Sequence, residues 1–357
     1  MGENGEILRD TIGQIKPADR GAMKMAWEHW DSLCKPLRGL GRLEEMVVRL
    51  AGAQRTPAPS ADRRAVVIMG ADNGVVAEGV SQTGSEVTRQ VLENMGEGIS
   101  TVCVMSSMLR ADVFPVDMGM NQKAIHPAVL DRAVRRGTGN IAGGPAMSRE
   151  ECVRAVEAGI SIARELREKG YDLVIAGEMG IGNTTTCAAC ACAFFGREPE
   201  ELTGRGAGLS TDGLKKKISA IRRALEVNRP DPSDPLDVIA KVGGLDIAGM
   251  TGLYLGCAAH GMAVLIDGAI SGLAACAAKM LCPLSAEYMF ATHCSSEPAE
   301  KMIFESLGMK PVLCADMHLG EGTGAAAYLP LLDQALNVYR HLPSFADGHV
   351  KAYEHLT

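Results

Sequence analysis

Short apolar runs alternate with longer helical patterns along most of this chain, and this alternation constrains the fold more than any other feature. Six runs indicate buried strands, at residues 65–70, 113–116, 172–176, 263–266, 287–291 and 311–314. Near-continuous apolar strands separated by helices are typical of a parallel sheet covered on both faces. We therefore predict an α/β fold with a large Rossmann-like domain, in which helices flank a parallel sheet.

The two ends of the chain have helical patterns in place of strands. Residues 41–50 carry apolar side chains at helical spacing, and the Thr-Pro-Ala-Pro-Ser sequence at 56–60 is typical of a linker. We predict that segments 1–58 and 329–357 together form a small helical domain. Residues 59–328 then form the α/β catalytic domain.

The composition is that of an ordinary globular protein. Of the 357 residues, 46% are hydrophobic and 22% charged, and the net charge of −7 argues against a general nucleic-acid binder. Eleven cysteines behind a polar, acidic N-terminus favour a cytoplasmic protein with free thiols. The longest apolar stretch, residues 258–281, contains His260 and Asp267, so we expect a strand and a helix there and no membrane span.

Nearly every predicted strand is followed by a polar side chain. These side chains are Asp72, Asp117, Glu178, Asp267, His293, and Asp316 leading to Glu321. In open parallel sheets, ligands bind at the carboxyl ends of the strands. We therefore expect these groups to line one site.

The turn at residues 177–186, Gly-Glu-Met-Gly-Ile-Gly-Asn-Thr-Thr-Thr, is the strongest local signal. It lies between an apolar run and a helical segment of small residues. A glycine-rich turn in this position lets backbone N–H groups approach an anion. Because the turn also carries a carboxylate and three hydroxyls, it predicts a phosphorylated substrate with a chemical step beside it.

The loop at residues 319–324, Leu-Gly-Glu-Gly-Thr-Gly, is the second candidate. Glu321 in a partly dry pocket can act as a base, because burial raises the pKa of a carboxyl. The same residues also fit a helix N-cap. From the loop alone, the two interpretations have equal weight.

A further glycine cluster, Gly-Arg-Gly-Ala-Gly-Leu at 204–209, resembles a dinucleotide fingerprint only superficially. Its third glycine comes too early, and no strand precedes it. With Lys215, Lys216 and Lys217 close behind, it is a candidate anion cradle, although at least two of these lysines fit a solvated helix face.

Two further segments are candidates for a metal or redox site and for a catalytic nucleophile. Cys187, Cys190 and Cys192 suggest a metal or redox site, but structural zinc needs four ligands, so small side chains packing a helix are the favoured interpretation. The sequence His-Cys-Ser-Ser-Glu at 293–297 lacks the Gly-x-Ser-x-Gly elbow of a nucleophile, and a polar ligand-binding turn is favoured.

Taken together, these motifs resemble the nicotinate-nucleotide–dimethylbenzimidazole phosphoribosyltransferase family of cobamide lower-ligand synthesis. The segments at 177–185 and 319–324 are the specific ones. The resemblance covers nearly the whole chain, because it extends to residues 35–44, 71–75, 86–90, 242–248, 267–268 and 295–298.

The family's reaction moves a phosphoribosyl group from nicotinate mononucleotide to an aromatic base and releases nicotinate. The resemblance implies that Glu321 is the general base for the ring N–H proton and that Glu178 lies near the ribose. It implies that the nucleotide's ribose and phosphate are held by Gly180, Gly182, Asn183, Thr184, Gly206, Lys217, Asp267 and Ser295. It implies that the aromatic base contacts Ser81, Gln90 and Leu319. No metal or cofactor is implied, because the leaving pyridinium already carries a positive charge, and a homodimer is expected.

The chain departs from the family pattern at several positions. The family usually has His at Asn73, an aromatic-Pro pair within residues 81–85, Glu at Asp246 and Arg at Cys294. Because the loop lines the expected base pocket, benzimidazoles, purines and phenols all stay open as acceptors. Three alternatives stay open too: one subunit of a heterodimer that activates phenols, a non-catalytic nucleotide- or cobamide-precursor-binding protein, and a thiol or metal sensor.

Overall fold

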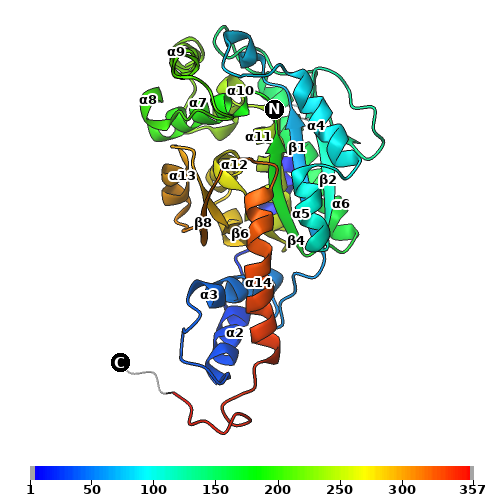
Figure 1. Ribbon diagram of the computed structural model, residues 1–357, viewed down its shortest axis with the longest axis vertical. Helices are drawn as coiled ribbons and strands as arrows, with labels where there is room; N and C mark the ends of the chain where they lie inside the picture. Colours follow the sequence, from blue (N-terminus) through cyan, green and yellow to red (C-terminus); the bar gives the residue numbers. More distant parts are fainter. Residues whose placement is uncertain (1–4, 354–357) are drawn as a thin grey trace.

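The computed structural model describes residues 5–353 and confirms the α/β fold (Figure 1). Its main sheet has six parallel strands in the order β3-β2-β1-β4-β5-β6. The strands are β1 (Arg64–Ala71), β2 (Ala111–Gly119), β3 (Leu130–Asp131), β4 (Leu173–Met179), β5 (Ala263–Ile266) and β6 (Met289–Ala291). The central strand β1 is buried over its whole length, which explains its unbroken apolar sequence.

Helices cover both faces of the sheet, and successive residues of a strand face opposite layers. In β1, Val67 packs into the core with α6 (Arg149–Glu168), α11 (Leu245–Ala259) and α12 (Gly268–Leu281). The next residue, Ile68, packs into the core with α3 (Arg42–Gln54), α5 (Thr101–Met108) and α14 (Thr323–His341).

The remaining helices lie at the ends and edges of these layers. They are α4 (Glu86–Gly96), α7 (Asn183–Phe195), α8 (Pro199–Leu202), α9 (Thr211–Asn228), α10 (Pro235–Val242) and α13 (Glu300–Leu307), with the 3₁₀ helices η1 (Gly74–Glu78) and η2 (Pro283–Tyr288). Among the helices of residues 5–353, none combines the length and apolar character that a membrane crossing requires.

A smaller helical lobe contains segments from both ends of the chain. Helices α2 (Arg20–Ser32) and α3 pack together against the long helix α14, which runs from the sheet into this lobe (Figure 1). Helix α1 (Glu6–Gln14) instead packs against α6 and α11 of the α/β body. The boundaries at residues 58 and 329 stay predictions.

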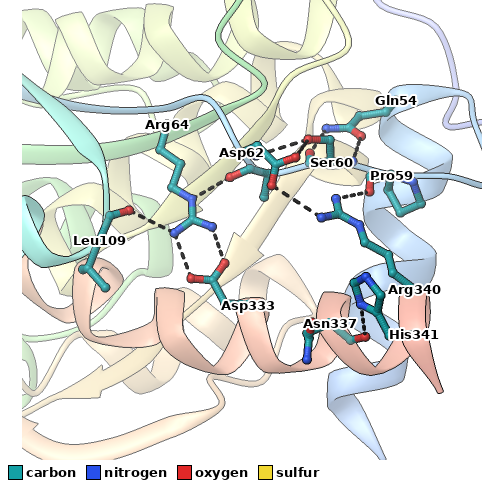
Figure 2. Close-up of polar contacts among 11 residues, drawn as sticks. Gln54, Pro59, Ser60, Asp62, Arg64, Leu109, Asp333, Asn337, Arg340 and His341 are labelled. Atoms are coloured by element: carbon teal, nitrogen blue, oxygen red, sulfur yellow. Dashed lines mark hydrogen bonds and ion pairs between the residues drawn. The ribbon is translucent and has the colours of Figure 1, made fainter.

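The segment that joins the lobe to the sheet is held against α14 (Figure 2). Arg64, at the start of β1, forms an ion pair with Asp333 of α14 and donates to the Leu109 carbonyl at 3.1 Å. Arg340 of the same helix donates to the Pro59 carbonyl at 2.9 Å. These contacts fix α14, whose other end carries the Glu321 loop.

A strand does form near residues 311–314, but the prediction that it belongs to the main parallel sheet is wrong. Leu313–Met317 forms β8, which pairs in parallel with β7 (His293–Ser295) in a separate two-stranded sheet. Because β8 is largely exposed, its apolar residues do not mark a strand of the buried sheet.

Candidate active site

A cavity of about 270 Å³ lies at the carboxyl ends of β4 and β5. Its walls come from the loops at residues 80–82, 180–182, 205–209 and 318–321, from the first turns of α7 and α12 and from β7 with Glu297, so distant parts of the sequence meet there. All but two of the predicted site residues line it, namely Glu178, Gly180, Gly182, Asn183, Thr184, Gly206, Asp267, Ser295, Ser81, Leu319 and Glu321.

Glu178 is the penultimate residue of β4, and its carboxyl group is buried in a defined orientation. Its Oε2 accepts a hydrogen bond from the side chain of Asn183, the first residue of α7. Burial raises the pKa of Glu178 well above its usual value, and the negative charges of Asp246 and Asp267 raise it further. A positive charge beside this carboxyl group would therefore stabilise its ionised form strongly.

Glu321 lies across the cavity on the turn before α14. Its backbone has a φ of +58° and its N–H donates to the Glu178 carbonyl oxygen at 3.2 Å, so the two acidic loops are joined by main chain. The neighbouring Gly320 approaches so closely that a Cβ there would lie 2.7 Å from Glu178 Oε1. Burial raises the pKa of Glu321 and the charge of Asp267 adds to this, while its Oε2 has no partner among the described residues.

Asp267 holds the Glu321 turn in place. Its carboxylate accepts from the Gly322 N–H at 3.0 Å and from the Ala325 N–H at 2.9 Å, which caps α14 from another strand. His293 lies 3.8 Å from the same carboxylate, and burial lowers its pKa. The predicted nucleotide-binding role of Asp267 stays a prediction, but its side chain already orients the turn that carries Glu321.

One end of the cavity favours an anion. Helix α7 begins there after Gly182, whose φ is +91°, so the positive end of its dipole lies at the cavity wall that Thr184 and Gly206 line. Lys217 does not line the cavity, but its buried Nζ donates to Thr184 Oγ1 at 2.8 Å and to the Gly204 carbonyl at 3.0 Å. Lys217 therefore adds a positive charge directly behind this wall.

Of the three lysines on α9, only Lys217 is buried. Lys215 and Lys216 are exposed, as the predicted solvated helix face requires. Burial lowers the pKa of Lys217.

Part of the lining is apolar. Val80, Ala269 and Ile270 line the cavity together with Leu319, which is 54% exposed. None of the first three could be found from a local motif, because they come from the loop after η1 and from the first turn of α12 and carry no distinctive chemistry.

The two predicted base-contacting residues of segment 81–90 have different positions. Ser81 lines the cavity, and the adjacent Gln82 side chain donates to the Ala207 carbonyl at 3.3 Å, which joins this loop to the 204–209 loop. Gln90 is exposed on α4 and is not among the lining residues.

Three of the polar side chains expected in the site, Asp72, Asp117 and Asp316, do not line the cavity. Asp72 accepts from the Asn121 N–H at 2.7 Å, and Asp117 accepts from the Met120 N–H at 2.8 Å and pairs with Arg136. Both carboxylates therefore hold the loop after β2, because that loop passes over the ends of β1 and β2.

A buried carboxyl group, that of Asp246, lies beneath the 177–186 turn. Asp246 is fully buried, and one of its oxygens accepts from the Ile247 N–H at 2.9 Å. Burial raises its pKa to about 6. A Cβ on Gly180 would lie 3.1 Å from Asp246 and 2.6 Å from the Ala71 carbonyl, so only glycine fits above this carboxyl group.

The three cysteines of α7 pack in the hydrophobic core, in agreement with the favoured interpretation. Cys187, Cys190 and Cys192 are buried and free in the core beside the sheet. Within residues 5–353, no group of three or more potential ligands is arranged to hold a metal ion.

Comparison with known proteins agrees with this geometry. A phosphoribosyltransferase family model matches residues 15–350. The nicotinate-nucleotide–dimethylbenzimidazole phosphoribosyltransferase of Ruminiclostridium cellulolyticum is 45% identical over 349 residues, covering 98% of this chain and 99% of that protein. The protein of the same name from Desulforamulus reducens is 46% identical over 346 residues, covering 96% and 99%.

Solved structures show the same relationship. The crystal structure of the Thermus thermophilus nicotinate-nucleotide–dimethylbenzimidazole phosphoribosyltransferase superposes with a TM-score of 0.87 at 39% identity, covering 93% of this chain and 99% of that one. Family, fold and the polar edge of the sheet therefore agree, and this chain belongs to the nicotinate-nucleotide–dimethylbenzimidazole phosphoribosyltransferase family.

Proposed function

We propose that this chain transfers the phosphoribosyl group of nicotinate mononucleotide to an aromatic lower-ligand base, 5,6-dimethylbenzimidazole or a related base, in cobamide synthesis. The products are an α-riboside 5′-phosphate and nicotinate. The observation that carries the proposal is the pair Glu178 and Glu321: both are buried, both have a raised pKa, and their loops are joined across one cavity.

Glu321 is the general base of the proposed reaction. The Glu321 carboxylate, which lines the cavity, takes the ring N–H proton while the base nitrogen attacks the anomeric carbon. The bond from that carbon to the nicotinate nitrogen breaks, and its electron pair returns to the pyridine ring. A raised pKa suits this role, because it makes the carboxylate a stronger proton acceptor near neutral pH.

The other groups bind and stabilise the nucleotide. Positive charge develops on the ribose as nicotinate leaves, and Glu178 stabilises it in a site where water is largely excluded. The 5′-phosphate binds at the start of α7, beside Gly206 and in the field of Lys217. Ser295, from β7, also lines the cavity.

The aromatic acceptor contacts the apolar lining residues Val80 and Ile270, together with Ser81 and Leu319. Dimethylbenzimidazole is the acceptor in the names of the relatives, which favours a benzimidazole here. The polar loop at 81–85 also suits a phenol, which would match a heterodimer with a paralogue. We infer a homodimer in the cytoplasm, and the free state of all eleven cysteines supports that compartment.

The test is to incubate the purified chain with nicotinate mononucleotide and a panel of benzimidazoles, purines and phenols, and to measure nicotinate release and riboside phosphate by mass spectrometry. We expect turnover with a benzimidazole by the chain alone. Turnover only with phenols and an added paralogue would favour the heterodimer. Binding without turnover under every condition would favour a non-catalytic role. Light scattering of the same sample gives the oligomeric state.

A further inference from the structure

Two cysteines face each other across the small β7–β8 sheet. Cys294 and Cys314 are direct register partners, and their sulfur atoms lie 3.3 Å apart as free thiols. Eight of the other nine cysteines are buried, and Cys34 is half-buried. The two facing thiols are therefore the most accessible pair in the protein.

The geometry of this pair suits a covalent bond. Directly opposed positions on neighbouring strands bring the two Cα atoms within the range that a disulfide spans. A disulfide bond has a length of about 2.05 Å, so forming it draws the two sulfur atoms together by roughly 1.3 Å. That movement is small enough to need no rearrangement of the fold.

The two thiols are not equivalent. Cys314 is exposed, whereas Cys294 is only half-exposed, and burial together with the adjacent Cys314 thiol raises the pKa of Cys294 to about 11. Arg42 of α3 lies close enough for its positive charge to oppose this rise, and it also donates to the Lys310 carbonyl at 3.2 Å. Cys314 is therefore the first thiol to react, and Cys294 is the second.

The position of the pair connects it to the cavity. Cys294 lies between His293 and Ser295, which both line the cavity. Beyond Cys314 the register shifts, so that Ser295 pairs with Met317, and the chain then continues into the Glu321 loop. A bond at this position joins the two strands just before they diverge to form the cavity wall.

We propose that Cys294 and Cys314 are a reversible thiol–disulfide site that reacts with a low-molecular-weight disulfide and, when oxidised, cross-links the cavity wall. The Cys314 thiolate attacks one sulfur of the small disulfide, forming a mixed disulfide and releasing one small thiol. Cys294, losing its proton to solvent, then attacks the Cys314 sulfur and releases the second small thiol. Two electrons pass from the protein dithiol to the small disulfide, and an added dithiol reverses the reaction.

Three proteins distinguish the steps: the wild-type chain, Cys294→Ser and Cys314→Ser. Each is treated with oxidised glutathione and measured by intact-mass and peptide mass spectrometry. We expect the wild type to lose two hydrogens and to yield a linked peptide pair. Cys294→Ser traps the glutathione adduct on Cys314, because the second thiol is missing. Cys314→Ser remains reduced at Cys294. Cys34→Ser is the matched control and behaves as the wild type.

The functional consequence is measured on the same samples and rests on the proposed function. A displacement of about 1 Å near reacting groups lowers rates substantially, so we expect roughly a tenfold loss of turnover on oxidation, with recovery after reduction. Cys314→Ser, which contacts no reacting group, keeps its basal turnover and loses the sensitivity to glutathione disulfide.

The proposal is overturned if the wild type keeps a stable glutathione adduct, or if Cys34 reacts while the pair stays reduced. A verified cross-link with unchanged turnover overturns its effect on the cavity. Failure of the phosphoribosyl transfer itself is distinguishable, because it leaves the mass-spectrometric result unaffected.

Discussion

The Glu321 N–H donates to the main-chain carbonyl of Glu178 at 3.2 Å, although the two residues come from loops 143 positions apart. Main-chain contact, rather than contact between the carboxylates, therefore sets the separation of the two acids. A second restraint comes from Asp267, which binds two N–H groups at the start of α14. The two acidic side chains are left directed at the cavity.

Replacing Glu321 by Gln removes the proton acceptor and preserves the shape of the side chain. We expect turnover to fall by about 10²–10⁴-fold, the usual contribution of a general base, with unchanged affinity for nicotinate mononucleotide. Steady-state kinetics and titration calorimetry measure the two quantities. Glu305→Gln, on the exposed side of α13, is the control. Unchanged turnover in Glu321→Gln would show that another group takes the proton.

Replacing Asp267 by Ala removes the side chain that orients the Glu321 turn. We expect turnover to fall by at least about tenfold, because the base is no longer held in position, and stability to fall by about 1–2 kcal/mol through loss of the cap. Asp234→Ala is a matched control, because Asp234 caps α10 through the Leu236 and Asp237 N–H groups. It should lose stability with unchanged turnover. Equal kinetic loss in both variants would contradict the positioning role.

Replacing Lys217 by Met removes a buried charge and keeps the length of the side chain. Its charge attracts the phosphate from behind the wall, so we expect the KM for nicotinate mononucleotide to rise about tenfold, which corresponds to about 1.4 kcal/mol. Lys216→Met, one position earlier and exposed, should leave KM unchanged. If both variants bind the nucleotide equally well, the phosphate lies elsewhere.

The raised pKa of Asp246 predicts that the stability of the protein depends on pH. Its folded pKa of about 6 exceeds the usual 3.8, so its stabilising contribution is present at low pH and is lost as pH rises through about 6. Relative to Asp246→Asn, we expect the wild-type free energy of unfolding to fall by about 2–3 kcal/mol between pH 4 and pH 7.

Urea unfolding across this pH range measures the difference between the two proteins. Asp212→Asn serves as the control, because the Asp212 side chain is 87% exposed on α9 and should give a difference that does not vary with pH. A pH-independent difference for Asp246→Asn as well would mean that Asp246 stays ionised throughout.

Much of the sheet could be predicted because its strands are buried on both faces. The apolar runs of β1, β2, β4 and β5 report that burial directly. β3 has two residues and β7 has three, so neither is long enough to produce a pattern. The placement of β8 beside β7 depends on pairing between segments about 20 residues apart, which no local signal describes.

Some features of the candidate site could likewise be predicted from the sequence, whereas others could not. The turns that carry Glu178 and Glu321 could be recognised because glycine and carboxylate stand together in the sequence. The cap that Asp267 supplies to α14 could not be recognised, because its two acceptor contacts are with N–H groups that lie 55 and 58 positions further along the sequence. The same limit explains Asp72 and Asp117, whose partners are loop N–H groups that only the folded chain brings near.

The sequence by itself determined the α/β class, the family and the two acidic turns, because burial periodicity and glycine-rich turns are local properties of a chain. Only the tertiary structure decided which polar strand ends share a cavity, that Lys217 lies behind its wall and that Cys294 faces Cys314. Those relationships depend on how distant segments pack and on the direction of each side chain, and these are settled only when the whole core closes.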